Sequence, residues 1–126
     1  MRLIRLGALV AVAILLSTLA TPVFGADISG QWTATFNTQV GEQHYVYTFK
    51  VDGEKLTGTA KSDNGTSDIQ NGSVKGDDIS FVENLNYQGQ QLTITYTGKV
   101  SGDEIHFTRD VGGFGREELV AKRVKQ

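Results

Sequence analysis

The stretch Leu92–Phe107 reads LTITYTGKVSGDEIHF, and its pattern decides the fold. Up to Val100, apolar residues and one glycine alternate with Thr or Lys, and the alternation resumes at Ile105 after a short polar interruption. Because successive side chains of a β-strand point to opposite faces, this alternation predicts two strands, each with one apolar and one polar face. The interruption has the length of a tight turn, so the stretch predicts a β-hairpin.

The turn of this hairpin recurs twice earlier in the chain. Residues 51–56 read VDGEKL, residues 74–79 read VKGDDI and residues 100–105 read VSGDEI. In each copy a Gly occupies the first central position of a two-residue loop, where a type II′ turn requires a positive φ. The sequence therefore predicts three hairpins of one kind.

The period of two continues along the chain, and no dozen residues show the spacing of an amphipathic helix. The expected strands cover residues 30–37, 44–52, 55–62, 67–75, 78–84, 91–100, 104–110 and 116–124. We therefore expect an all-β fold, an eight-stranded antiparallel up-and-down β-barrel. A barrel of eight strands either fills its lumen with side chains or holds one small ligand there.

Loop lengths divide the expected barrel into two ends. The three tight turns all fall at one end of an up-and-down barrel. The connections 38–43, 63–66, 85–90 and 111–115 are longer and fall at the other end. Because binding residues are frequently carried on loops above a rigid scaffold, we expect any binding site at this loop-rich end.

The first 25 residues have the features of a secretory signal peptide. Two arginines precede an apolar run from Leu6 to Leu19, which is followed by a small residue, Gly25, before Ala26. The run is shorter than the roughly 20 residues that a membrane-spanning helix needs. We expect cleavage near Gly25/Ala26, a periplasmic or secreted location, and one mature domain of residues 26–126.

Composition narrows the chemistry of the mature chain. The sequence has no Cys, which excludes disulfides, thiol catalysis and Cys-based zinc sites. The leader contains two of the 12 basic residues and none of the 14 acidic ones, so residues 26–126 carry a net charge of −4. A mildly acidic protein is a poor match for nucleic acid or for an anionic membrane, so neither is an expected partner.

A family resemblance begins at Gly30-Gln31-Trp32, which resembles the Gly-x-Trp signature on the first strand of calycin barrels, the group of lipocalins, fatty-acid-binding proteins and avidins. Residues 52–59, DGEKLTGT, resemble the second hairpin of avidins. The resemblance implies that Trp32 plugs the closed end and packs on a basic residue of the last strand, for which Arg123 is correctly placed. Ala34 stands where avidins carry the Asn that holds biotin, so biotin is not the expected ligand. The chain is also similar, more diffusely, to β-rich modules at the ends of secreted bacterial glycoside hydrolases.

Five residues are candidates for binding at the loop-rich end: Glu83, Tyr87, Arg109, Phe114 and Arg116. Glu83 and Arg109 are in phase with inward-facing apolar residues, so they form either an ion pair, a hydrated rim or a polar anchor for a ligand. Phe114 lies among three glycines and either covers the mouth as a lid or folds down as a plug of the core.

No catalytic or metal-binding pattern accompanies these candidates. The two histidines, His44 and His106, lie on separate strands and are expected to be solvated. The oxygen-rich run 63–68 lacks the spacing of a calcium loop and is expected to be a turn. The sequence contains no nucleophile or phosphate-loop signature, so we expect no enzyme activity, no metal and no cofactor.

The sequence therefore indicates an exported, non-catalytic binding module with a small ligand or glycan at the loop-rich end. The alternative is an interaction protein, such as an inhibitor or accessory module of a secreted glycoside hydrolase, which acts through the outer surface of its barrel.

Overall fold

The computed structural model describes residues 26–125. The expected signal peptide, residues 1–25, lies outside the described residues. Between residues 26 and 125 there is no helix long and apolar enough to cross a membrane.

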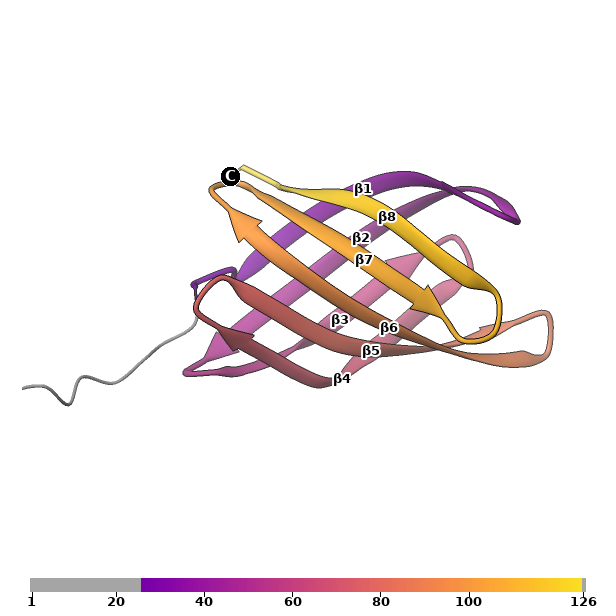
Figure 1. Cartoon of the computed structure of the whole chain (residues 1–126), viewed down its shortest axis with the longest axis horizontal. Coiled ribbons are helices and arrows are strands. Elements are labelled where there is room, and N and C mark those ends of the chain that lie inside the picture. Colours follow the sequence, from indigo (N-terminus) through magenta and orange to yellow (C-terminus); the bar gives the residue numbers. More distant parts are fainter. Residues whose placement is uncertain (1–25, 126) are drawn as a thin grey trace, which may run out of the picture.

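Eight antiparallel strands close into one barrel in which each strand pairs with its neighbours in the sequence (Figure 1). The strands are β1 (Gly30–Thr38), β2 (Gly41–Asp52), β3 (Lys55–Ser62), β4 (Gly65–Lys75), β5 (Asp78–Tyr87), β6 (Gln90–Ser101), β7 (Glu104–Val111) and β8 (Gly115–Arg123). The expected all-β, eight-stranded antiparallel barrel is confirmed.

The repeated Gly turns adopt the predicted backbone. Gly53, Gly76 and Gly102 have φ values of 65°, 59° and 63°, and the residue after each has a negative φ. This is the φ pattern of a type II′ turn, which needs a positive φ at its first central residue alone. These three turns join β2 to β3, β4 to β5 and β6 to β7 at one end of the barrel.

The expectation of long loops at the other end is wrong. The strands extend until two residues separate β1 from β2, β3 from β4 and β5 from β6, and three residues separate β7 from β8. At the β5–β6 turn the reason lies in the backbone, because Gln88 and Gly89 have φ values of 52° and 81°. Positive φ at both central residues is the pattern of a type I′ turn, which fits the twist of paired strands and lets pairing continue to the turn. The mouth of the barrel is therefore framed by hairpin tips.

The lower lumen is filled by stacked aromatic side chains. Tyr47, Phe81, Tyr96 and Phe107 are at most 2 % exposed, and the rings of Phe81 and Tyr96 stack with centroids 4.3 Å apart. Phe107 meets the edges of both rings. Gly98 makes this packing possible, since a Cβ at that position would overlap the ring of Phe107. The lower half of the barrel is therefore a packed core without an open channel.

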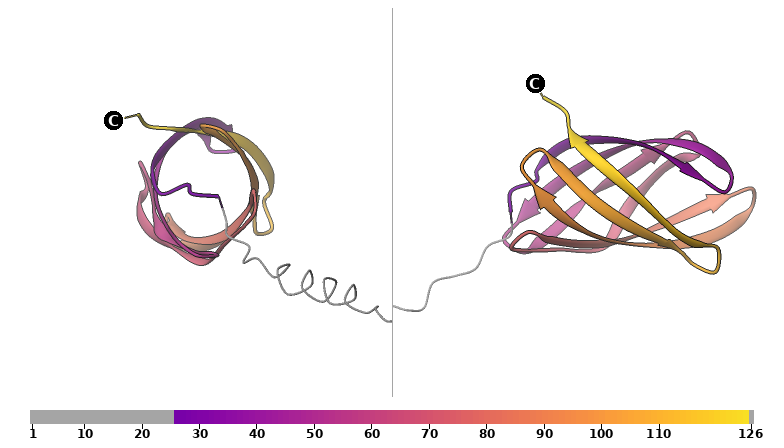
Figure 2. Two further views of the ribbon diagram at one scale, coloured as in Figure 1. Left: turned by 90° about the vertical axis from the view of Figure 1, so that its left-hand side faces the viewer. Right: turned by 45° about the horizontal axis from the view of Figure 1, so that its top comes forward.

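Residues before β1 close the end that carries the type II′ turns. The segment Ala26–Ser29 runs across this opening (Figure 2, left), and the Ala26 backbone N–H donates to the Gly76 carbonyl oxygen at 2.9 Å. Beneath it, the Trp32 indole Nε1 donates to the Ile28 carbonyl oxygen at 2.9 Å. The Arg123 guanidinium carbon lies 4.5 Å from the centroid of the Trp32 ring. The structure thus brings Trp32 and Arg123 together in the closed end.

The pairing of β1 with β8, which closes the barrel, is the shortest of the eight strand pairings. β1 and β8 pair only at Trp32↔Arg123 and Thr33↔Lys122, whereas every other neighbouring pair of strands has at least five register partners. Above these residues the two strands diverge toward the mouth (Figures 1 and 2). An outer groove of about 600 Å³ follows the seam between them. At the mouth the seam is bridged again, because the Gln39 side-chain amide donates to the Phe114 carbonyl oxygen at 2.8 Å.

The closed end makes a prediction about stability. Trp32 is fully buried, so Trp32→Ala removes a large packed side chain and the hydrogen bond to Ile28. The free energy of unfolding should fall by roughly 3–5 kcal/mol, as measured by urea denaturation followed by circular dichroism. Thr33→Ala, on the exposed side of the same strand, is the control and should change it by less than about 0.5 kcal/mol. A loss at Trp32 no larger than the loss at Thr33 would contradict a plug role for Trp32.

Candidate functional site

The mouth of the barrel contains a cavity of about 240 Å³ above the aromatic core. Its side chains come from six of the eight strands and from all four turns at this end. They are Thr38, Gln39, Val40, Gln43, Tyr45, Asn64, Leu85, Tyr87, Gln88, Gln90, Leu92, Ile94, Arg109, Val111, Phe114 and Glu117. Aliphatic and aromatic side chains form the walls, carboxamides and the hydroxyls of Thr38 and Tyr87 surround the opening, and Arg109 and Glu117 are the two charged members.

Arg109 is the central polar group of this cavity. It is 4 % exposed, and its guanidinium carbon lies 5.0 Å from the ring centroid of Phe36, 5.1 Å from that of Tyr45 and 5.4 Å from that of Tyr96. Alternation along β7 directs Arg109 inward in phase with Ile105 and Phe107. Aromatic faces attract a cation, so these three rings offset part of its desolvation.

Glu117 is the ion partner of Arg109. The two residues oppose each other in the β7–β8 register, and the Glu117 carboxylate Oε1 lies 3.2 Å from the Arg109 Nε. The alternative of an ion pair between Arg109 and Glu83 is therefore wrong. Within residues 26–125, no Glu83 oxygen lies close enough to Arg109 to form an ion pair.

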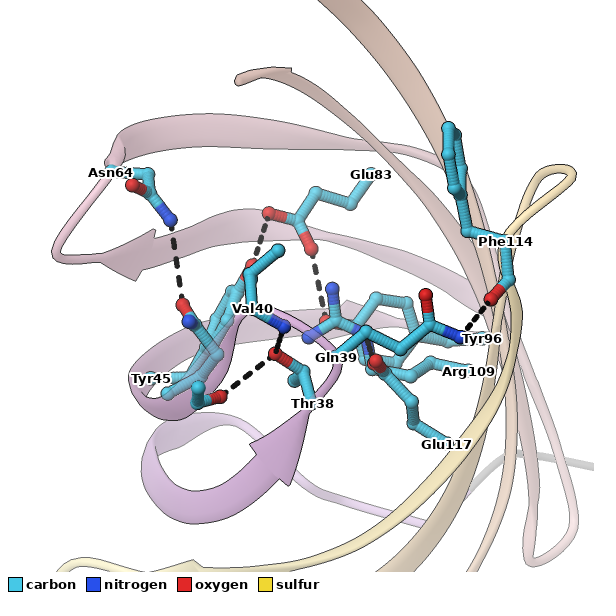
Figure 3. Close-up of polar contacts among 12 residues, drawn as sticks. Thr38, Gln39, Val40, Tyr45, Asn64, Glu83, Tyr96, Arg109, Phe114 and Glu117 are labelled. Atoms are coloured by element: carbon cyan, nitrogen blue, oxygen red, sulfur yellow. Dashed lines mark hydrogen bonds and ion pairs between the residues drawn. The ribbon is translucent and has the colours of Figure 1, made fainter. Parts of the chain in front are cut away.

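Glu83 lies deeper than expected, beneath the cavity, and is 1 % exposed. Its two carboxylate oxygens accept hydrogen bonds from the hydroxyls of Tyr45, at 3.0 Å, and Tyr96, at 2.9 Å (Figure 3). A further hydrogen bond of 2.9 Å joins the hydroxyls of Tyr96 and Tyr47. Glu83 therefore belongs to a buried, hydrogen-bonded network beneath the cavity, and the alternative in which it forms part of a hydrated rim is wrong.

Burial sets the protonation behaviour of this network. Desolvation raises the pKa of Glu83, although Arg109 and the two tyrosine hydroxyls oppose the shift. Burial, together with the charge of Glu83, also raises the pKa of Tyr45 to about 12. Burial raises the pKa of Glu117 as well, and Arg109 opposes that shift. One cation is thus enclosed with two carboxyl groups, each of which is costly to ionise there.

Arg109 and Glu117 are incompletely satisfied. The Arg109 Nε and Nη1 atoms and the Glu117 Oε1 atom are buried, and none of them makes a hydrogen bond within the described residues. The 3.2 Å approach of Nε and Oε1 is an ion contact without hydrogen-bond alignment. Because buried charged groups are almost always hydrogen-bonded, two donors and one acceptor remain for a molecule in the cavity.

Of the remaining candidates, Tyr87 and Phe114 line the cavity, whereas Arg116 does not. Tyr87 lines the cavity and is half-buried. Phe114 also lines it but is 49 % exposed on the β7–β8 turn, so the alternative in which it folds down as a plug of the core is wrong. Arg116 lies outside the cavity, because its 75 % exposed side chain pairs with Asp110 on the outer face. The Gly-rich turn is only three residues long and holds Phe114 at the rim, above the packed interior.

The sequence analysis missed two site residues, Glu117 and Tyr45. Glu117 is two residues from Leu119, which faces inward, so the period of two on β8 already placed it in the lumen. Tyr45 lies in phase with Tyr47 in the same way. Arg116 was a candidate because it is a charged residue close to Phe114, but the side chain of its neighbour Glu117 is the one that faces inward.

The arrangement is suited to binding. Among residues 26–125, no three His, Cys, Asp or Glu side chains come together to hold a metal ion. The polar groups of the cavity instead offer donors and an acceptor beside apolar walls, which is the usual composition of a small-molecule site.

The buried carboxyl of Glu83 makes a prediction about pH. A raised pKa means that the folded protein keeps the Glu83 proton to higher pH than the unfolded chain, whose Glu pKa is about 4.3. Glu83 ionisation therefore destabilises the fold as pH rises above that value. Glu83→Gln has no ionisable group at this position. Its free energy of unfolding relative to that of the wild type should therefore increase between pH 4 and pH 8, as measured by urea unfolding. Glu118→Gln, on the outer face, is the control, and a Glu83→Gln difference that stays constant or falls with pH would contradict the assignment.

Comparisons with known proteins leave the site to be interpreted from its geometry. No family model matches the chain, and no curated protein or solved structure matches it.

Proposed function

We propose that this chain is an exported, non-catalytic binding protein whose small ligand occupies the mouth cavity. The observation that carries the proposal is the pair of Arg109 nitrogens that are buried without a hydrogen-bond partner beside a cavity of about 240 Å³. A cation in an apolar site costs free energy unless its hydrogen bonds are made, and a ligand would make them. The cavity walls would supply the apolar contact that small-molecule sites use.

The leader supports the exported part of the proposal. Residues 1–25 have the composition of a secretory signal peptide, and the barrel begins only a few residues after the expected cleavage site. A stable fold without cysteine is compatible with the periplasm or the medium, where redox conditions vary.

Phe114 tests the location of the site. Phe114→Ala should weaken ligand binding because it removes an aromatic wall, while the free energy of unfolding changes little at a position that is 49 % exposed. Binding is measured by thermal shift and by amide chemical-shift titration, with monosaccharides, short-chain carboxylates and benzamide as probes. Arg116→Ala is the matched control in the same hairpin, since its side chain points to the outer face.

A probe that shifts amides around Arg109, and binds Phe114→Ala less tightly than Arg116→Ala, would support the mouth site. A probe that binds all three proteins equally would place the site elsewhere on the barrel. The absence of binding by every probe would contradict small-ligand binding itself.

A second candidate function is interaction with a protein through the outer surface, as in an accessory module of a secreted hydrolase. The observation that favours it is the short β1–β8 ladder, which leaves the facing edges of Ala34–Asn37 and Glu118–Ala121 outside the strand pairing. Unpaired strand edges can accept an extended segment of another chain by strand addition.

Hydrogen exchange tests whether these edges are available. Backbone amides of Ala34–Asn37 and Glu118–Ala121 that lack a ladder partner should exchange much faster than amides of the β5–β6 ladder, which pairs from Asp78 to Tyr87. Exchange followed by two-dimensional NMR resolves each amide. Equal protection in the two regions would mean that the seam is closed in solution, and it would remove the observation on which the second candidate rests.

A further inference from the structure

The unsatisfied atoms of the mouth cavity define a pattern of donors and acceptors. Arg109 offers hydrogens from Nε and Nη1, and the Glu117 Oε1 atom beside them can only accept while the carboxyl is ionised. A complementary ligand group must accept from Arg109 and donate to Glu117 at nearly the same place. A hydroxyl does both, whereas a carboxylate only accepts and an ammonium only donates.

The charge balance of the interior disfavours an anionic ligand. Glu83 and Glu117 already place two carboxyl groups around the single cation of Arg109. Glu83 is held by the tyrosine hydroxyls, and Glu117 lies in contact with the guanidinium. An anionic ligand group would meet repulsion from the Glu117 carboxylate in a weakly screened site, so an uncharged ligand satisfies Arg109 at lower cost.

The opening has the same preference for uncharged polar groups. Five carboxamide side chains line the cavity, from Gln39, Gln43, Asn64, Gln88 and Gln90. Each carboxamide can donate and accept, as hydroxyl groups do. In the lining, no charged side chain other than Arg109 and Glu117 is present among the described residues.

The volume and the walls limit the size of the ligand. At about 30 Å³ per water molecule, a cavity of about 240 Å³ has the volume of about eight waters, which is enough for one six-membered ring with substituents. Tyr87 and Phe114 at the rim, with Leu85 and Leu92 below, offer apolar surface to the face of such a ring. A long acyl chain would have to displace the packed aromatic core.

We infer that the mouth cavity binds a neutral, polyhydroxylated ring of single-sugar size, with adjacent hydroxyls between Arg109 and Glu117; this inference rests on the proposed small-ligand function. Arg109 donates to a ring hydroxyl, Glu117 accepts from the same or the adjacent hydroxyl, and the rim carboxamides contact the hydroxyls that face the opening.

Matched pairs of sugars test the inference. Glucose, galactose and mannose are titrated against the mature chain beside glucuronate, galacturonate and mannuronate, and dissociation constants are taken from amide chemical shifts in NMR spectra. Each uronate replaces a hydroxymethyl group with a carboxylate and leaves the ring hydroxyls in place. At least one neutral sugar should bind roughly tenfold more tightly than its uronate, because the anion adds a charge beside two carboxyl groups.

Glu117→Gln tests the role of the acceptor. The variant removes one negative charge and keeps an acceptor oxygen, so the preference for the neutral sugar over its uronate should shrink by roughly tenfold, because the uronate no longer meets the Glu117 charge. Glu118→Gln changes the adjacent residue on the outer face and should leave the preference unchanged. Circular dichroism and the unfolding midpoint of both variants establish that they are folded.

The outcomes separate the inference from the function on which it rests. Benzoate and benzamide, which carry no hydroxyl group, are titrated as further probes. Tighter binding of a uronate, benzoate or benzamide than of every neutral sugar, with shifts around Arg109, would overturn the sugar inference and leave the mouth site as proposed. Shifts confined to the outer face, or the absence of binding by all probes, would overturn both. An unchanged sugar preference in Glu117→Gln would overturn the placement of the ligand beside the Glu117 charge.

Discussion

A guanidinium keeps its charge at any pH that a folded protein meets, so a buried arginine obliges its surroundings to adapt. In this barrel the arginine is Arg109, and the upper lumen is arranged around it. Rings of Phe36, Tyr45 and Tyr96 lie within 5.4 Å of its guanidinium carbon, and Glu117 supplies the opposing charge. Even so, two of its nitrogens lack hydrogen bonds, and this deficit lies at the edge of a cavity.

The two halves of the barrel therefore differ in structure: the lower half is a packed core and the upper half contains the cavity. Below Glu83, packed aromatic rings and the Trp32 plug give a dense core, which fixes the backbone that carries the site. Above it, Arg109 and Glu117 occupy inward positions between apolar walls. The tyrosine hydroxyls mark the boundary, because their rings belong to the core and their oxygens hold Glu83. A rigid floor of this kind keeps the side chains of a binding site in place without a ligand.

Local patterns in the sequence predict much of this fold. Alternation gives eight strands and the phase of Arg109, and the repeated Gly turns give three hairpins at one end. The lengths of the connections at the other end are harder to predict, because polar residues such as Gln88 are typical of loops, whereas a positive φ lets Gln88 form a tight turn. Propensity scales count such residues against a strand, but cross-strand pairing outweighs propensity once the hairpin forms.

The site was less predictable because it depends on registers between strands. Phase shows that Glu83 and Arg109 both face inward, but only the register places Arg109 opposite Glu117. Equally, the height of Glu83 in the lumen follows from its position in the β5–β6 ladder, where it pairs with Ile94 below the rim. A single sequence contains alternation explicitly, whereas register appears only after the barrel has closed.

The state of the Arg109 guanidinium tests the central claim most directly. A nitrogen-detected or proton–nitrogen NMR spectrum of the mature chain at neutral pH resolves the Nε–H group of each arginine. We predict a slowly exchanging, shifted Nε–H signal for Arg109, which is 4 % exposed, and a rapidly exchanging one for Arg116, whose side chain is 75 % exposed. If the Arg109 Nε–H exchanged with water as fast as that of Arg116, the charge would be solvated, and the account of a buried arginine above the core would be contradicted.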